Sequence, residues 1–305
     1  MIPDQQSLVI WVIDDGKPGH RNQSLGFAEA MGRIQDVSIH LLSLPHNVGV
    51  FSRIKKVREE ASKLPKPKMI IAAGHRTHFP LIYLANKTGA RSVVLMRPSL
   101  PFGWFDHCLI PEHDFAEGRK APENVTLTKG ALNRVTYDPE VKDGSGLILI
   151  GGKSSEFGFN GESLHKAIIE IVGQDKGIQW TLTDSRRTSA GFIESLKDVP
   201  ITTCPHQTTS SNWLPEQLRR ASVVWVTEDS VSMIYEALSS GAKVGLLPMP
   251  RVKNAGRVAK GVEALVEEGR LCRYELWQET HKLPQCWAAL VEADQCARSV
   301  TKDYA

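Results

Sequence analysis

Residues 222–248 contain one complete strand–turn–helix–strand unit. The apolar, β-branched run at 223–226 is typical of a buried strand, and the polar residues at 227–230 favour a turn and a helix N-cap. Apolar side chains at helical spacing follow as far as Gly241, the expected C-terminal cap, and 243–247 has the composition of the next strand. Such a unit belongs in a parallel sheet, whose ligands bind beyond the carboxyl ends of the strands.

The turn of this unit, followed by the start of a helix, is a candidate site for an anion. The first N–H groups of a helix have no partner within the helix, and the helix dipole is positive at that end, so a phosphate is favoured there. Glu236 follows about two helical turns later, where its carboxylate could accept hydrogen bonds from the ribose of a nucleotide. The alternative is a capped helix in an ordinary α/β domain.

The same alternation of buried strands and helices runs through the chain and indicates an α/β fold with parallel sheets covered on both faces. A chain of 305 residues suits two domains, and the polar stretch 133–146 is the candidate linker. The expected strands are 8–13, 37–42, 69–73, 92–96, 108–111, 125–128, 147–150, 179–183, 201–204, 223–226 and 243–247. The expected helices are 25–31, 48–64, 80–87, 163–172, 214–221, 231–238, 251–269 and 284–299.

Charge and cysteine content exclude several classes of protein. A net charge of +3 argues against strong nucleic-acid binding. The N-terminus lacks a signal-peptide pattern, and no apolar run approaches the ~20 residues that span a bilayer. We therefore expect a cytoplasmic protein, with at most peripheral contact at the inner face of the membrane. The cysteines are scattered without a C-x-x-C pair, so we expect reduced thiols at Cys108, Cys204, Cys272, Cys286 and Cys296.

The loop expected at 14–24, after the first strand, carries the best candidate for proton transfer. His20 is the one side chain in it whose ordinary pKa suits acid–base chemistry near neutrality. A solvated surface histidine is the alternative. Lys17 and Arg21 could hold a negatively charged substrate or could be exposed charges. A second polar and basic turn follows the strand at 69–73.

Three turns of the second half project from the same sheet edge. The glycine pair at 151–155 would let backbone approach a phosphate, although it matches neither a dinucleotide fingerprint nor a P-loop. Arg187, in the turn 185–188, could pair with a diphosphate through its planar fork, or be simply exposed. Together with 227–232, these turns suit a nucleoside diphosphate. No compact His/Cys cluster is present, so we expect no metal.

The helix expected at 48–64 is basic and amphipathic. Its charges are Arg53, Lys55, Lys56 and Arg58. Such charges form either a solvated face or a surface for an anionic membrane or acceptor.

Four motifs resemble the mitochondrial-fission "elongated mitochondria" family and its bacterial relatives. They are Asp-Gly-Lys-Pro-Gly-His-Arg-Asn-Gln-Ser at 15–24, Gly-Gly at 151–152, Ser-Arg-Arg-Thr at 185–188, and Thr-Glu-Asp-Ser-Val-Ser-Met at 227–233 with Glu236 and Ala237. The resemblance covers nearly the whole chain. Because the chain is compact and lacks a eukaryotic-style extension, we expect a bacterial member.

The resemblance implies a glycosyltransferase-B-like fold, with two Rossmann-like domains facing across a cleft. We expect an acceptor domain at 1–140, a nucleotide-sugar domain at 141–285, and a final helix at 286–305 that crosses back to the first domain. Bacterial relatives are often labelled nucleoside-diphosphate-sugar epimerases. That label fits poorly, because the sequence shows no dinucleotide fingerprint and no Tyr-x-x-x-Lys pair in the expected context.

Residues and resemblance together predict an enzyme that transfers a sugar from a nucleotide-sugar to an envelope glycan or lipid, without a cofactor. The alternative is a non-catalytic scaffold that binds a protein partner. The expected catalytic residues are His20 and Asp15. The expected donor-binding residues are Gly151, Gly152, Lys153, Ser185, Arg186, Arg187, Thr227, Asp229, Ser230, Val231, Ser232, Met233 and Glu236. The expected acceptor or cleft residues are Gly16, Lys17, Gly19, Asn22, Gln23, Gly74, His75 and Arg76.

Overall fold

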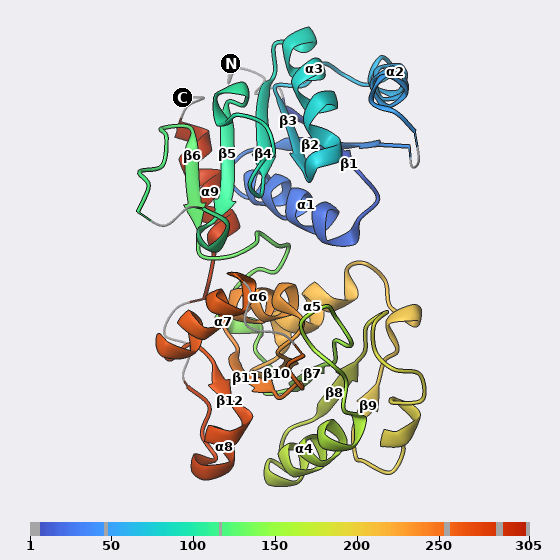
Figure 1. Ribbon diagram of the computed structural model, residues 1–305, viewed down its shortest axis with the longest axis vertical. Helices are drawn as coiled ribbons and strands as arrows, with labels where there is room; N and C mark the ends of the chain where they lie inside the picture. The colour runs from blue at the N-terminus through green and yellow to red at the C-terminus, as the bar shows by residue number, and fades with distance from the viewer. Residues whose placement is uncertain (1–6, 46–47, 116–117, 253–256, 285–288, 303–305) are drawn as a thin grey trace. The chain divides into compact units, whose positions relative to one another are not determined.

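The computed structural model describes residues 7–45, 48–115, 118–252, 257–284 and 289–302. The chain divides into two compact units, which we call unit 1 (Met1–Arg134 and Val291–Ala305) and unit 2 (Val135–Leu290). Each unit contains a six-stranded, wholly parallel sheet flanked by helices (Figure 1). The α/β class predicted from the sequence is therefore confirmed. Within the described segments, no helix has both the length and the apolar character needed to cross a membrane.

The sheet of unit 1 has the strand order β2-β1-β3-β4-β5-β6. Its strands are β1 (Leu8–Asp14), β2 (Val37–Ser43), β3 (Met69–Ala73), β4 (Arg91–Leu95), β5 (His107–Pro111) and β6 (Val125–Thr128). Its helices are α1 (Pro18–Gly32), α2 (Val50–Ala61), α3 (His78–Thr88) and α9 (Glu292–Thr301). Successive residues of a strand face opposite sides, so Ile10 enters the core beneath α1 and α9, whereas Trp11 enters the core beneath α2 and α3.

The sheet of unit 2 has the strand order β12-β11-β10-β7-β8-β9. Its strands are β7 (Gly146–Leu149), β8 (Trp180–Thr183), β9 (Thr202–Thr203), β10 (Val223–Thr227), β11 (Lys243–Leu247) and β12 (Cys272–Arg273). Its helices are α4 (Gly161–Gln174), α5 (Trp213–Arg220), α6 (Val231–Ser239), α7 (Arg257–Glu267) and α8 (Tyr274–Thr280). Val224 of β10 packs with Ile234 of α6 on one face, and Trp225 packs against Trp277 of α8 on the other.

In each sheet the first strand of the unit lies in the interior. The strands that follow it are added first on one side and then on the other, so the strand order reverses once. In unit 1 the reversal lies between β1 and β3, and in unit 2 it lies between β7 and β10. Ligands of parallel sheets bind at such switch points, outside the carboxyl ends of the strands. The turns that follow these four strands are therefore the places where chemistry is expected.

The prediction that 14–24 is a loop is wrong for most of its length. Helix α1 begins at Pro18, seven residues earlier than expected from the apolar pattern. A proline is favoured at the first helical position, because that position needs no N–H donor and the ring presets a helical φ. His20 consequently lies in the first turn of α1 and is held by helical backbone.

The predicted linker is not a free connection. Val135 belongs to the core of unit 2, and Lys142 Nζ donates hydrogen bonds to the carbonyl oxygens of Leu218 (3.2 Å) and Ala221 (2.7 Å). Gly146 already opens strand β7. The first unit thus ends at Arg134, whereas the sequence placed the boundary after residue 140. Polar composition marked 133–146 as a linker, but its residues from Val135 onward belong to unit 2.

Two predicted helices begin later than the sequence suggested. Arg251 pairs in an isolated antiparallel bridge with Phe157, and α7 begins at Arg257, while 253–256 lie outside the described residues. The last helix begins at Glu292 instead of 284, because Leu290 is packed into the core of unit 2. Trp287 and Cys286 lie outside the described residues. Helix α9 packs against α1, so the end of the chain belongs to unit 1.

The segments outside regular strands and longer helices include short 3-10 turns. These are η1 (His75–Thr77), η2 (Phe102–Trp104), η3 (Glu112–Asp114), η4 (Pro139–Val141), η5 (Glu194–Leu196) and η6 (His206–Thr208). The strand β12 and the helix α8 were not predicted. A two-residue strand has too few positions to show alternation, which explains the first omission.

The close approach of α1 to the chain at Asn133 predicts a steric requirement for glycine. A Cβ atom at Gly26 would lie 2.2 Å from the backbone oxygen of Asn133. Gly26→Ala should therefore lower the free energy of unfolding by about 1–3 kcal/mol, as overpacking does. Gly19→Ala on the same helix meets nothing within 4 Å and should be neutral or stabilising by up to ~1 kcal/mol. Denaturant unfolding compares the two; equal stability would contradict this packing.

Candidate functional site

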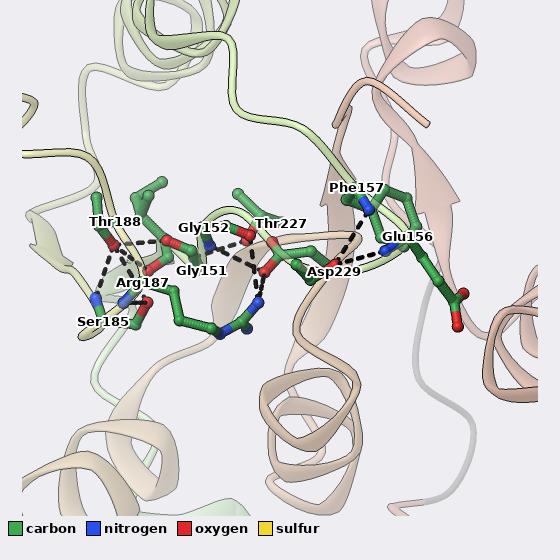
Figure 2. Close-up of polar contacts among 11 residues, drawn as sticks. Gly151, Gly152, Glu156, Phe157, Ser185, Arg187, Thr188, Thr227 and Asp229 are labelled. Atoms are coloured by element: carbon green, nitrogen blue, oxygen red, sulfur yellow. Dashed lines mark hydrogen bonds and ion pairs between the residues drawn. The ribbon is translucent and has the colours of Figure 1, made fainter. Parts of the chain in front are cut away.

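Three turns of unit 2 are tied together at the switch point between β7 and β10. Figure 2 shows the hydrogen bonds that join them. The N–H of Gly151 donates to Thr227 Oγ1 (2.7 Å), and the N–H of Gly152 donates to Asp229 Oδ2 (2.9 Å). The turn after β7 is thus anchored to the turn after β10.

The turn after β8 joins the same cluster through Arg187 and Thr188. Arg187 Nη1 lies 2.8 Å from Asp229 Oδ2 and donates to the carbonyl oxygen of Gly152 at 3.2 Å. Thr188 Oγ1 donates to the carbonyl oxygen of Gly151 at 2.5 Å and accepts from the N–H of Ser185 at 2.9 Å. The guanidinium expected to bind a diphosphate therefore already holds a carboxylate of its own chain.

The glycine pair is explained by this packing. A Cβ at Gly152 would lie 1.9 Å from the backbone oxygen of Arg187, and a Cβ at Gly151 would lie 2.4 Å from the Asp229 carboxylate oxygens. The close approach that the sequence suggested for a phosphate is made here by neighbouring turns. The two glycines are a structural requirement, whatever ligand binds nearby.

A cavity of about 190 Å³ lies next to these turns, at the beginning of α6. The Asp229 side chain is fully shielded from solvent, and its Oδ1 atom accepts no hydrogen bond from any residue that the structure describes. An unpartnered buried acceptor is costly, and the guanidinium of Arg187 beside Oδ2 offsets part of that cost. The lining residues are Ser154, Ser155, Glu156, Phe157, Glu228, Asp229, Val231, Arg251 and Val262.

An ion-pair network borders this cavity, and sequence reasoning missed it. Arg273 forms ion pairs with Glu228 and, through Nη2, with Glu263 Oε2 at 2.6 Å. The other oxygen of the Glu263 carboxylate lies 2.7 Å from Arg251. Burial raises the pKa of Glu228 even though Arg273 and Arg251 oppose that shift. Arg251 also lies over the ring of Phe157, 5.7 Å from its centroid. Only Glu228 had a signal in the sequence, since it follows a predicted strand.

The helix α6 presents its N-terminus at the same edge. Ser230 is the N-cap residue, yet its side chain makes no capping hydrogen bond. Of the other residues expected to bind the donor, Ser232, Lys153 and Arg186 are exposed, and Val231 and Met233 are half-buried. Glu236 is buried, with 7% of its surface exposed. It lies in α6, the helix whose N-terminus is the expected phosphate site.

The site residues of unit 1 centre on an aspartate–histidine pair. Nδ1 of His20 lies 3.0 Å from Asp15 Oδ2 and 3.1 Å from Oδ1, and the Asp15 side chain is buried. The N–H of Lys17 donates to the same carboxylate at 3.2 Å. A neutral imidazole that donates from Nδ1 to this carboxylate presents the lone pair of Nε2, the form that a general base requires.

Gly74 forms the surface on which this imidazole rests. Its φ is +87°, and a Cβ there would lie 2.3 Å from His20 Cε1, so a side chain is excluded for two independent reasons. Because Gly74 follows β3 and Asp15 follows β1, the pair lies at the switch point of the unit 1 sheet. The structure thus brings His20, Asp15 and Gly74 together.

The other acceptor candidates are more dispersed. Lys17, Gly19 and His75 are exposed, and Gly16 supports its turn with a φ of +78°. Arg76 Nη2 donates to the carbonyl oxygen of Pro45 at 3.0 Å, which gives that guanidinium a structural partner. Asn22 and Gln23 are half-buried on α1.

The contact between Arg187 and Asp229 predicts a measurable coupling. Arg187→Met removes the cation that faces a solvent-shielded carboxylate, and it should lower the unfolding free energy of unit 2 by about 1–3 kcal/mol. Adding Asp229→Asn should restore part of that loss, because the buried charge is then absent. Chemical denaturation of the wild type, both single variants and the double variant gives the coupling; simple additivity would argue against this role.

Comparisons with known proteins place the chain in context. An uncharacterised protein of Rickettsia prowazekii, RP120, is 26% identical over 315 residues, which cover 85% of this chain and 88% of that protein. A structure from Listeria monocytogenes assigned as a UDP-N-acetylglucosamine 2-epimerase matches with a TM-score of 0.63 at 14% identity, covering 98% of this chain and 96% of that one. A UDP-glucosyltransferase from Polygonum tinctorium matches with a TM-score of 0.52 at 9% identity, covering 97% and 93%.

These structural matches extend over both units and show a glycosyltransferase-B-like fold, as the sequence predicted. The sequence profile described as "Mitochondrial fission ELM1" matches residues 18–304, which include His20, the turn after β3 and the turns at the switch point of unit 2. The chain therefore belongs to the mitochondrial fission ELM1 family.

Proposed function

We propose that the protein is a glycosyltransferase that uses a nucleotide-sugar donor. The observation that carries this proposal is the pair formed by His20 and the buried Asp15. A scaffold that binds a protein partner needs no imidazole whose tautomer is set by a carboxylate, whereas a transferase needs a base for the acceptor hydroxyl. Among the residues that the structure describes, we find no comparable feature that favours the alternative scaffold function.

In the proposed reaction, His20 Nε2 takes the proton of an acceptor hydroxyl, whose oxygen forms a bond to the anomeric carbon of the donor. The bond from that carbon to the phosphate oxygen breaks, and the nucleoside diphosphate leaves with the electron pair. Asp15 stabilises the imidazolium that results, because its carboxylate faces Nδ1. The acceptor is an envelope glycan or lipid in this proposal.

Unit 2 supplies the donor site of the proposal. The N-terminus of α6 favours the diphosphate, and Lys153 extends a charge from the turn after β7. Glu228 lines the adjacent cavity and could accept a hydrogen bond from a hydroxyl group, so one ligand could combine both kinds of contact. The names of the Listeria and Polygonum proteins, which both refer to UDP-sugar chemistry, support a nucleotide-sugar as the ligand class.

Removal of the exposed charge at Lys153 should weaken donor binding without unfolding the protein. Calorimetry with a panel of nucleoside diphosphates and their sugars should identify a ligand for the wild type. Lys153→Gln should reduce its affinity about tenfold, the effect of one charged hydrogen bond. Lys176→Gln is the control, because this exposed lysine precedes β8 at the opposite edge of the sheet. If both variants bind like the wild type, Lys153 does not contact the donor.

Loss of the imidazole at His20 should slow transfer and leave donor binding intact. Positioned bases contribute about 10²–10⁴-fold in rate, so His20→Ala should lower kcat by that factor. Asp15→Asn should also lower kcat, since an amide does not stabilise the imidazolium. His165→Ala on α4 serves as the matched control. Donor affinity and melting temperature are measured in parallel, and a His20→Ala variant with wild-type kcat would remove this residue from the mechanism.

A further inference from the structure

The positive charge of the protein is concentrated in one segment of unit 1. Residues 50–68 contain seven lysines and arginines against two glutamates, which gives this segment a charge of +5. The whole chain carries only +3, so the remainder is net negative. The cations are Arg53, Lys55, Lys56, Arg58, Lys63, Lys66 and Lys68, and all except the half-buried Arg53 are exposed.

Helix α2 carries an exposed aromatic side chain within this basic segment. Phe51 is 90% exposed, the largest exposed fraction among the large apolar side chains that the structure describes. Lys55 and Arg58 follow at helical spacing, so they share one face with Phe51. The opposite face, with Val57 and Ala61, is buried in the core of unit 1. Figure 1 shows α2 beside α3 at one side of this unit.

A single exposed apolar side chain is common on protein surfaces, but Phe51 stands within a concentrated basic surface. An aromatic ring surrounded by lysines and arginines fits the boundary between headgroups and acyl chains of an anionic bilayer. The ring enters the apolar side of that boundary, and the cations meet the lipid phosphates. We propose that unit 1 docks on anionic lipid surfaces through the outward face of α2 and the basic segment that follows it.

This inference does not depend on the proposed transferase activity, because the docking surface shares no residue with the candidate site. Nucleic acid phosphates would also attract the lysines and arginines. They provide no apolar layer for Phe51, whereas a bilayer offers both phosphates and an apolar interior. A lipid surface therefore accounts for both parts of the α2 face.

The test is co-sedimentation of the full-length protein with vesicles at low salt. Binding is expected with mixed phosphatidylcholine and phosphatidylglycerol vesicles, and not with phosphatidylcholine alone. Molar salt should release the protein, because it screens charges beyond a few ångströms. Lys55→Gln together with Lys56→Gln should weaken binding about 25-fold, at roughly fivefold for each cation. Phe51→Ser should weaken it by about tenfold, as a partly buried aromatic ring would.

Matched controls come from helix α4 in unit 2. Lys166→Gln and Ile169→Ser change an exposed lysine and an apolar side chain of 49% exposure, and neither should alter vesicle binding. Melting temperatures establish that all variants fold. Equal binding to both vesicle types, or wild-type binding by the α2 variants, would overturn the proposal. Binding to a single-stranded RNA that is lost with the α2 variants, without vesicle binding, would assign the surface to nucleic acid instead.

Discussion

The carboxylate of Asp229 is the contact on which the candidate site of unit 2 depends. It lies beyond the end of β10, accepts the N–H of Gly152 and faces the guanidinium of Arg187. Three turns that are far apart in the sequence meet through it (Figure 2). A buried charge is stable only with such partners, so the positions of all three turns are fixed together. This cluster therefore fixes the positions of the cavity wall and of the N-terminus of α6.

The switch point of unit 1 is also organised by a buried aspartate, but its partner is a different side chain. The aspartate is Asp15, whose carboxylate holds an imidazole in place of a guanidinium. Gly74 leaves room for the ring, as Gly151 leaves room for the Asp229 carboxylate. The same sheet geometry therefore holds an imidazole at one switch point and a guanidinium at the other. In the proposed function, the first is the base and the turns around the second carry the donor.

Local patterns predicted most of the strands and helices, although not β12 and α8, and they did not predict the contacts among turns. The segment 243–247 was predicted with the bounds of β11, because a buried run between turn residues has little alternative. The start of α1 was missed, since apolar periodicity begins several residues after Pro18. The pairing of Asp229 with Gly152 spans 77 residues, and no pattern in a single sequence reveals it. For that reason the glycine pair was assigned to a phosphate.

Donor turnover tests the central claim most directly. The purified protein is incubated with a panel of isotopically labelled nucleotide-sugars and an extract of bacterial envelope lipids and glycans. The account predicts that one donor transfers its label to an acceptor and releases a nucleoside diphosphate in equal amount. Conversion of the donor to an isomeric nucleotide-sugar without an acceptor would indicate an epimerase. A donor panel left bound but unchanged, or not bound at all, would contradict the account.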